Sequence, residues 1–116
     1  MLTDTKSWEK IMSNMGIENN DRIVVYDYSD VISSCRCWYT FRYFGHDSSL
    51  VSVLDGGLKK WRQEGKPTVN YNTIINESIY KAIENKDMVK SKIEIDENIR
   101  LNNFKVVDAR LSLIHI

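Results

Sequence analysis

Two short apolar stretches decide the fold of this chain: IVVYD at residues 23–27 and LVSVL at residues 50–54. Short, nearly apolar runs rich in valine and isoleucine are typical of strands that are buried on both faces, as in a parallel sheet. Between them, residues 31–44 lack glycine and proline and carry apolar or aromatic groups on nearly every side, which predicts a helix packed on several sides. The turn DGG at 55–57 and a short helix ending near Gly65 follow the second strand. The alternation of strand and helix predicts an α/β fold with a parallel sheet.

The flanking segments predict further elements. A cap-rich start and a periodic apolar face indicate a helix over 5–15, with Trp8 and Met12 on one side. Beyond the proline at 67, an asparagine-rich stretch is typical of a linker, and lysine and acidic residues four apart predict a helix over 85–98. FKVVD at 104–108 predicts a third buried strand.

Composition limits the possible functions. With 116 residues, 42% of them hydrophobic, we expect one compact domain at most. A formal net charge of zero argues against nucleic-acid and membrane-surface partners, which need a basic field. The apolar stretches are far shorter than the ~20 residues of a membrane-spanning helix. Two cysteines and no basic-then-apolar leader favour a cytoplasmic protein.

Few residues suggest chemistry on their own. Cys35 and Cys37 could be metal ligands or a redox pair, with His46 as a third ligand, but two positions apart on a helix their side chains diverge by about 200°. We therefore expect both cysteines to be packing residues and His46 to be a surface or packing group. Asp27 ends the first strand, where an open α/β sheet places its sites. An aspartate before a helix favours capping or loop bracing over nucleophilic catalysis.

The order of the motifs carries more information than any one residue. VVYD is followed by SSCRCWYTFRYFGH at 33–46 and by VSVLDGGLKKWRQEGKP at 51–67. An arginine before two aromatics (Arg36, Trp38, Tyr39), a helix ending in R-x-F-G-H, and L-D-G-G-L-x-x-W resemble the first domain of two-domain sulfurtransferases of the rhodanese and 3-mercaptopyruvate sulfurtransferase family. FKVVDAR at 104–110 resembles the opening strand of the second domain in that family.

The resemblance implies a rhodanese-like parallel sheet flanked by helices and incomplete in this chain. Residues 1–67 would be the C-terminal part of the first, non-catalytic domain, 68–103 an inter-domain linker and helix, and 104–116 the start of the second domain. The apolar tail 111–116 matches nothing in the family, and we interpret it as non-native in a truncated reading frame. In the family, the second domain carries its catalytic cysteine at the loop position that Asp27 fills here.

By the same resemblance, Arg110 matches an arginine that binds the small anionic sulfur donor, thiosulfate or 3-mercaptopyruvate, and no cofactor or metal is implied. The catalytic cysteine loop would lie outside this chain, so we expect the chain alone to be inactive. Two alternatives stay open: a non-catalytic rhodanese-like binding or regulatory module, favoured by Asp27, and a small metal or redox protein using Cys35, Cys37 and His46.

Overall fold

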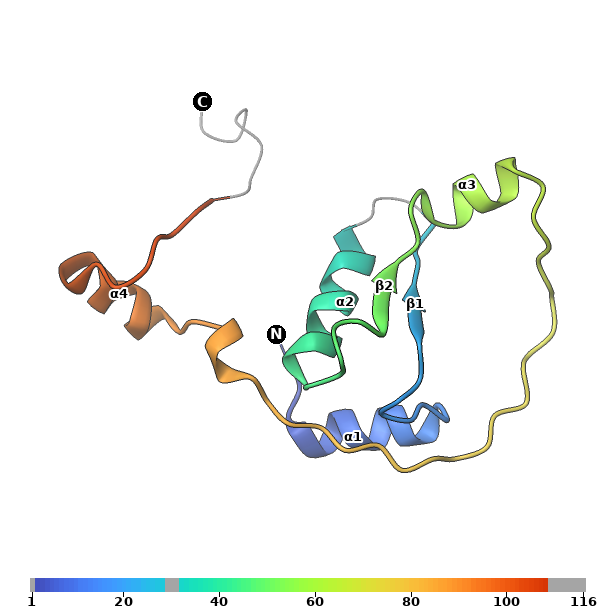
Figure 1. The fold of residues 1–116 in the computed structure, drawn as a ribbon, viewed down its shortest axis with the longest axis horizontal. Helices are drawn as coiled ribbons and strands as arrows, with labels where there is room; N and C mark the ends of the chain where they lie inside the picture. The colour runs from blue at the N-terminus through green and yellow to red at the C-terminus, as the bar shows by residue number, and fades with distance from the viewer. Residues whose placement is uncertain (1, 29–31, 109–116) are drawn as a thin grey trace.

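The computed structural model describes residues 2–28 and 32–108 of the chain (Figure 1). Four α-helices, two strands and one 3-10 helix lie in these ranges, in the order α1 (Thr5–Asn14), β1 (Ile23–Val25), α2 (Ile32–Tyr43), β2 (Val51–Val53), α3 (Gly57–Gln63), η1 (Lys86–Met88) and α4 (Lys92–Leu101). The two strands are parallel, with Ile23 opposite Val51 and Val25 opposite Val53. This arrangement confirms the α/β class and the parallel sheet, with α2 as the crossover between the strands.

The core lies between α1, α2 and β2. Trp8 of α1 stacks on Phe44 at 4.9 Å between ring centroids and meets Phe41 edge-on at 5.2 Å. Aromatic pairs in these geometries stabilise a core beyond their area of burial. The buried apolar side chains are Trp8, Met12, Phe41, Tyr43, Phe44, Val51 and Tyr80.

Both strands were expected to be buried on two faces, and this expectation is wrong. Val24 is 51% exposed and Ser52 is exposed, whereas Val51 is buried. Side chains of a strand alternate between its faces. The face carrying Ile23 and Val51 is covered by the aromatic core, while no helix in the described ranges covers the opposite face at Val24 and Ser52. The strands are also shorter than the predicted 23–27 and 50–54.

The helix α2 has one exposed face, which corrects the prediction that it packs on several sides. Cys35 and Tyr39 are exposed there, because α1 and the sheet cover only the opposite half of the helix. The Tyr39 hydroxyl nevertheless donates a hydrogen bond to the carbonyl oxygen of Met88, which ties η1 to α2.

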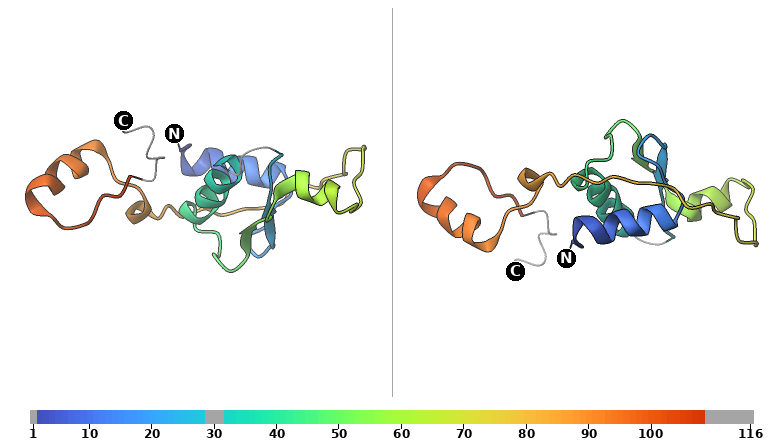
Figure 2. Two further views of the ribbon diagram at one scale, coloured as in Figure 1. Left: turned by 90° about the horizontal axis from the view of Figure 1, so that it is seen from above. Right: turned by 90° about the horizontal axis from the view of Figure 1, so that it is seen from below.

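Residues 78–85, which we call the strap, run across α1 and α2 (Figures 1 and 2). Residues 68–85 form neither helix nor strand, and the strap within them is attached to α1 and α2. The Ser78 amide donates to Ser13 O at 3.0 Å, and the Ile83 amide donates to Phe44 O at 3.0 Å. The Ala82 amide donates to the Glu9 carboxylate at 2.9 Å. Tyr80 closes the core from this side.

The prediction of one helix over 85–98 is wrong in its bounds. A capping box fixes the start of α4: the Ser91 hydroxyl accepts from the Glu94 amide, and the Glu94 carboxylate accepts from the Ser91 amide. Glu94 is therefore engaged at the cap, and Lys90 precedes the helix, where its ammonium lies 5.2 Å from the Phe104 ring centroid. Lys90 and Glu94, one of the lysine–acid pairs four apart on which the predicted helix rested, therefore form no ion pair.

The third strand expected at 104–108 is absent from the described residues. The Asn98 side chain binds both backbone groups of Phe104, at 3.0 and 2.8 Å, and so holds the chain against α4. Val106 and Val107 are exposed, because a strand needs a neighbouring strand and none of the described segments lies beside them. None of the described helices is long and apolar enough to cross a membrane.

Candidate functional site

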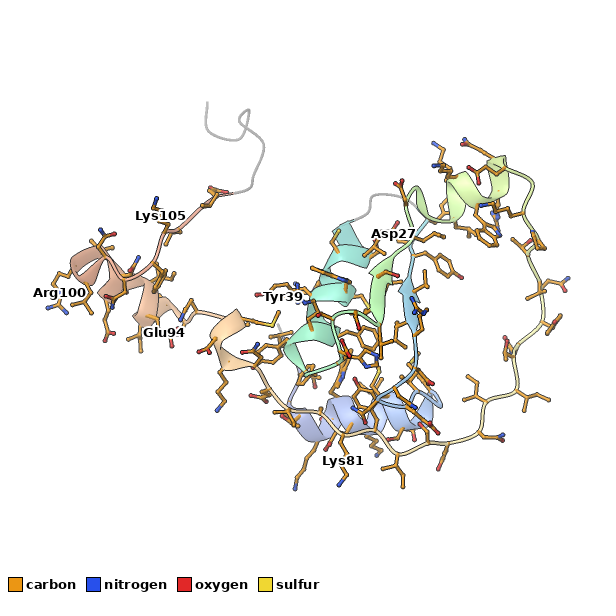
Figure 3. All side chains as sticks on the ribbon, in the orientation of Figure 1. Asp27, Tyr39, Lys81, Glu94, Arg100 and Lys105 are labelled. Carbon is orange, nitrogen blue, oxygen red and sulfur yellow. The ribbon has the colours of Figure 1, made fainter. Side chains whose placement is uncertain are left out.

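The edge of the sheet at which β1 and β2 end is the candidate site. Asp27 follows β1, and the turn Asp55-Gly56-Gly57 follows β2. The carboxyl ends of parallel strands meet at one edge, and open α/β sheets bind their ligands there. Figure 3 shows Asp27 at this edge, beside the first turn of α2.

Asp27 braces the starts of two helices. Its carboxylate accepts a hydrogen bond from the Ser34 amide at 3.2 Å, in the first turn of α2. Its main-chain oxygen accepts from the Leu58 amide at 2.9 Å, at the start of α3. A carboxylate is favourable at this place because the first amides of a helix lack partners within it. The side chain thus has the bracing role that the sequence favours.

Gly57 allows this close approach. It has a positive φ of 60°, and a Cβ atom at this position would lie 2.5 Å from the main-chain oxygen of Asp27. A side chain cannot be accommodated against backbone at that distance. The glycine pair of the DGG turn therefore positions α3 against the end of β1.

The two cysteines differ in environment and share no site. Cys35 is exposed, which corrects its expected packing role, whereas Cys37 is half-buried against the core as expected. Burial raises the pKa of the Cys37 thiol, which disfavours the nucleophilic thiolate. In residues 2–28 and 32–108, no three histidine, cysteine or acidic side chains come together to hold a metal ion.

His46 is a packing residue with both ring nitrogens engaged. Nε2 lies 2.9 Å from Asp21 O, and Nδ1 lies 2.8 Å from the Tyr80 hydroxyl. A carbonyl oxygen can only accept, so Nε2 donates to Asp21 O, and in the neutral imidazole Nδ1 then accepts from the Tyr80 hydroxyl. A buried, doubly hydrogen-bonded imidazole is unavailable as a ligand or a base, in agreement with the sequence interpretation.

An apolar groove of about 730 Å³ lies on the uncovered face of the sheet. Its walls come from β1 and the residue after it, from α3, and from the chain that follows α3; they are Val24, Tyr26, Leu54, Leu58, Trp61, Arg62, Pro67, Thr68 and Val69. The Arg62 guanidinium lies 5.6 Å from the Tyr28 ring centroid, so it is stacked on an aromatic side chain. The groove could not be predicted from the sequence, because apolar residues follow the same pattern in a fully buried strand and in a half-exposed one.

Arg110, the predicted donor-binding residue, lies outside the described residues, as does the tail 111–116. Among the described residues, the candidate site consists of Asp27, Gly57 and the first turn of α2.

Comparison with known families decides the family of this site. The model of the rhodanese-like domain family matches residues 1–64. The chain belongs to the rhodanese-like domain family. It is 35% identical over 112 residues to the thiosulfate sulfurtransferase of Rattus norvegicus, covering 95% of this chain and 37% of that protein. It is 45% identical over 82 residues to thiosulfate/3-mercaptopyruvate sulfurtransferase 2 of Arabidopsis thaliana, covering 71% of this chain and 23% of that protein.

The fold of this rhodanese-like chain matches a solved structure. The crystal structure of SseA from Escherichia coli, titled as a 3-mercaptopyruvate sulfotransferase with the rhodanese fold, superposes with a TM-score of 0.86 at 24% identity. The match covers 99% of this chain and 43% of that one. The rhodanese-like chain thus spans less than half the length of each of these relatives.

Proposed function

We propose that this rhodanese-like chain is part of a sulfurtransferase that moves sulfane sulfur from thiosulfate or 3-mercaptopyruvate, through a cysteine persulfide, to a thiol or cyanide. The cysteine that carries the sulfur would lie outside these 116 residues. The observation that carries this proposal is the likeness to a thiosulfate sulfurtransferase along 95% of this chain. The names of its relatives support the reaction class.

The chemistry explains why this loop matters. A thiolate before a helix has a depressed pKa and attacks the outer sulfur of the donor, forming a persulfide and releasing the rest of the donor. Loop amides stabilise the charged sulfur until an acceptor removes it. A carboxylate at position 27 cannot carry sulfur in this way. Neither Cys35 nor Cys37 replaces it, because both lie within α2 rather than in the loop before it.

Arg110 is the donor-binding residue of the proposal. A planar, permanently charged guanidinium suits a small anion such as thiosulfate, to which it can donate two parallel hydrogen bonds. No other residue of the chain is assigned to the donor. The free thiols Cys35 and Cys37 support a reducing compartment, and we propose the cytoplasm.

Thiocyanate formation from thiosulfate and cyanide tests the proposal. We expect the purified chain to stay at the background rate, and Cys35→Ser and Cys37→Ser to leave that rate unchanged. Turnover that is abolished by either substitution would overturn it, since α2 would then carry the sulfur. In a longer chain that continues the reading frame past Arg110 into a cysteine loop, turnover should appear, and Arg110→Gln should raise KM for thiosulfate more than it lowers kcat.

A non-catalytic rhodanese-like module is the second candidate. Asp27 in place of a sulfur carrier favours it, since such a domain keeps the fold without the nucleophile. The DNA beyond the Arg110 codon separates the two: a continuation into a cysteine loop supports the enzyme, and a stop codon in independent clones supports the module.

A further inference from the structure

The outer edge of β1 has no partner in the described part of the chain. The Ile23 amide donates to Leu50 O at 2.7 Å and Val25 O accepts from the Leu54 amide at 2.8 Å, so both residues turn their backbone groups toward β2. In a parallel pair, the residue between them turns its N–H and C=O the other way. The backbone of Val24 therefore points out of the two-stranded sheet, where no described strand meets it.

The opposite edge of the sheet, at β2, is partly blocked. The indole N–H of Trp38 donates to the outward carbonyl oxygen of Val51 at 3.3 Å. An incoming strand thus meets a side chain at β2 and open backbone at β1. An open edge next to an apolar surface is a template for strand addition.

The groove beside β1 limits what can occupy this edge. It runs from Val24 and Tyr26 to the chain at Pro67–Val69, which forms its far wall. Because this wall bounds the groove opposite β1, a single extended segment suits it better than the edge of a second sheet with its helices attached.

The chain itself contains such a segment. Lys105, Val106 and Val107 follow the anchored Phe104 and have no strand partner among the described residues. Val106 is 64% exposed and Val107 is 84% exposed. The sequence KVVD at 105–108 resembles the strand-forming IVVYD at 23–27. In an added strand, Val106 and Val107 would point to opposite faces, so that one of them enters the groove.

Residues 105–107, which we call the donor segment because they would supply the added strand, lie at the opposite end of the molecule from the groove. Figures 1 and 2 show α4 and the chain after it on one side and α3 on the other, and Figure 3 shows Lys105 on the far side of the molecule from Asp27. The strap ties the connecting chain to α1 and α2. The segment of one copy therefore reaches the β1 edge of a second copy rather than its own. A net charge of zero leaves no overall repulsion between copies.

We propose that two copies of this chain associate by strand addition, with residues 105–107 of one copy pairing along the outer edge of β1 in the other. This contact is independent of sulfur transfer. The contact joins two different surfaces, the segment of one copy and the β1 edge of the other. Two copies can therefore exchange segments to form a closed dimer, or further copies can add one after another to form an open chain.

Proline substitutions test the pairing on the full 116-residue chain. Val24→Pro removes an amide that points away from β2, so it spares the hydrogen bonds within the chain. Val106→Pro/Val107→Pro removes the donor strand in either register. We expect light scattering and sedimentation to show self-association of the parent chain, weakened at least about tenfold in each variant. Ile74→Pro, at an exposed apolar residue outside both segments, is the matched control and should associate like the parent.

Mixing the two variants gives the decisive measurement. One retains a donor segment and the other retains an acceptor edge, so we expect a 1:1 complex that grows no further. A mixture that stays monomeric overturns the proposal. So does self-association that survives Val106→Pro/Val107→Pro, because edges of β1 would then pair directly. If circular dichroism shows that Val24→Pro is unfolded, Val24→Lys is used in its place. Association of Val24→Lys that is as strong as that of the parent chain would also contradict the proposal.

Discussion

At the scale of single residues, the contact between His46 and Tyr80 holds the strap in place. The two residues are 34 positions apart in the sequence, and Nδ1 of His46 lies 2.8 Å from the hydroxyl oxygen of Tyr80. Burial raises the pKa of the Tyr80 hydroxyl above its ordinary value of 10.0, so the hydroxyl keeps its proton and can donate to a neutral imidazole. His46 could be predicted as a packing group from its place after a helix-ending glycine. Tyr80 could not, because its burial depends on a chain reversal that leaves no local periodicity.

Removal of the Tyr80 hydroxyl should destabilise the fold. Tyr80→Phe leaves Nδ1 of His46 buried without a donor, and we expect the free energy of unfolding to fall by about 1–3 kcal/mol. Urea denaturation followed by tryptophan fluorescence measures the change. Tyr71→Phe is the matched control, since Tyr71 is exposed and should change stability by less than about 0.5 kcal/mol. If both variants lost the same free energy of unfolding, the contact with His46 would contribute nothing measurable to stability.

The two thiols should react at different rates. Cys35 is exposed, whereas burial shields Cys37 and raises its pKa. In a disulfide-exchange titration, the Cys37→Ser variant, which retains Cys35, should react faster than the Cys35→Ser variant. The rate at Cys37 should rise over a higher pH range, because its thiolate forms there. We also expect Cys35→Ser to be nearly neutral and Cys37→Ser to lose at most about 1–3 kcal/mol of stability. Equal labelling rates would contradict the half-buried position of Cys37.

At the scale of elements, sequence patterns predict what is local and miss what depends on neighbours. The bounds of α1 and α2 follow from caps, glycines and apolar spacing, all of which lie within the segment. The exposure of Val24 depends on which helix covers the second face of the sheet, and residues 105–107 require a partner strand. Neither condition can be read from the segment itself. The start of α4 was missed although Ser91 and Glu94 form a recognisable capping box.

The turn between β2 and α3 should tolerate no side chain at Gly57. Gly57→Ala combines a positive φ with a Cβ atom 2.5 Å from Asp27 O, so we expect a loss of about 3 kcal/mol. Gly65→Ala is the matched control: its φ is 71°, but no atom lies within 4 Å of the added Cβ, so only the backbone cost of about 1 kcal/mol applies. Denaturation midpoints of the two variants measure the difference. Equal losses would mean that the end of β1 does not approach Gly57 closely.

Acid should weaken the start of α1. The Ser7 amide donates to the Asp4 carboxylate at 2.7 Å and holds the pKa of Asp4 below its ordinary value of 3.8. A group with a lowered folded-state pKa stabilises the fold above its unfolded-state pKa, and this contribution is lost as the pH falls below 3.8 through the folded-state value. The Asp4→Asn variant keeps a capping oxygen without the titration. As the pH falls below 3.8, the denaturation midpoint of Asp4→Asn should therefore fall less than that of the parent chain. If the two midpoints fell equally with pH, the capping role of the Asp4 carboxylate would be contradicted.

At the scale of the whole molecule, the chain is extended for its length. Its radius of gyration is 17.7 Å, compared with about 13 Å for a compact domain of this size. The small core lies at one place, between α1, α2 and β2, and α4 has no buried residue. The second face of the sheet is left to the apolar groove, and one edge of β1 is open. These features leave apolar surface of the described fold open to solvent.

Marginal stability of the isolated chain follows from this geometry. With one face of the sheet and the segment 105–108 exposed, apolar burial offsets only part of the entropy lost on folding. We therefore expect a broad thermal transition or a partly molten state that binds hydrophobic dyes, together with self-association at the open edge. Calorimetry and size-exclusion chromatography of the 116-residue chain measure both properties. A monodisperse monomer with a single cooperative transition above about 55 °C, the range of ordinary domains, would contradict the proposal of an incomplete domain. It would favour the non-catalytic module, because such a module must be stable on its own in order to bind anything.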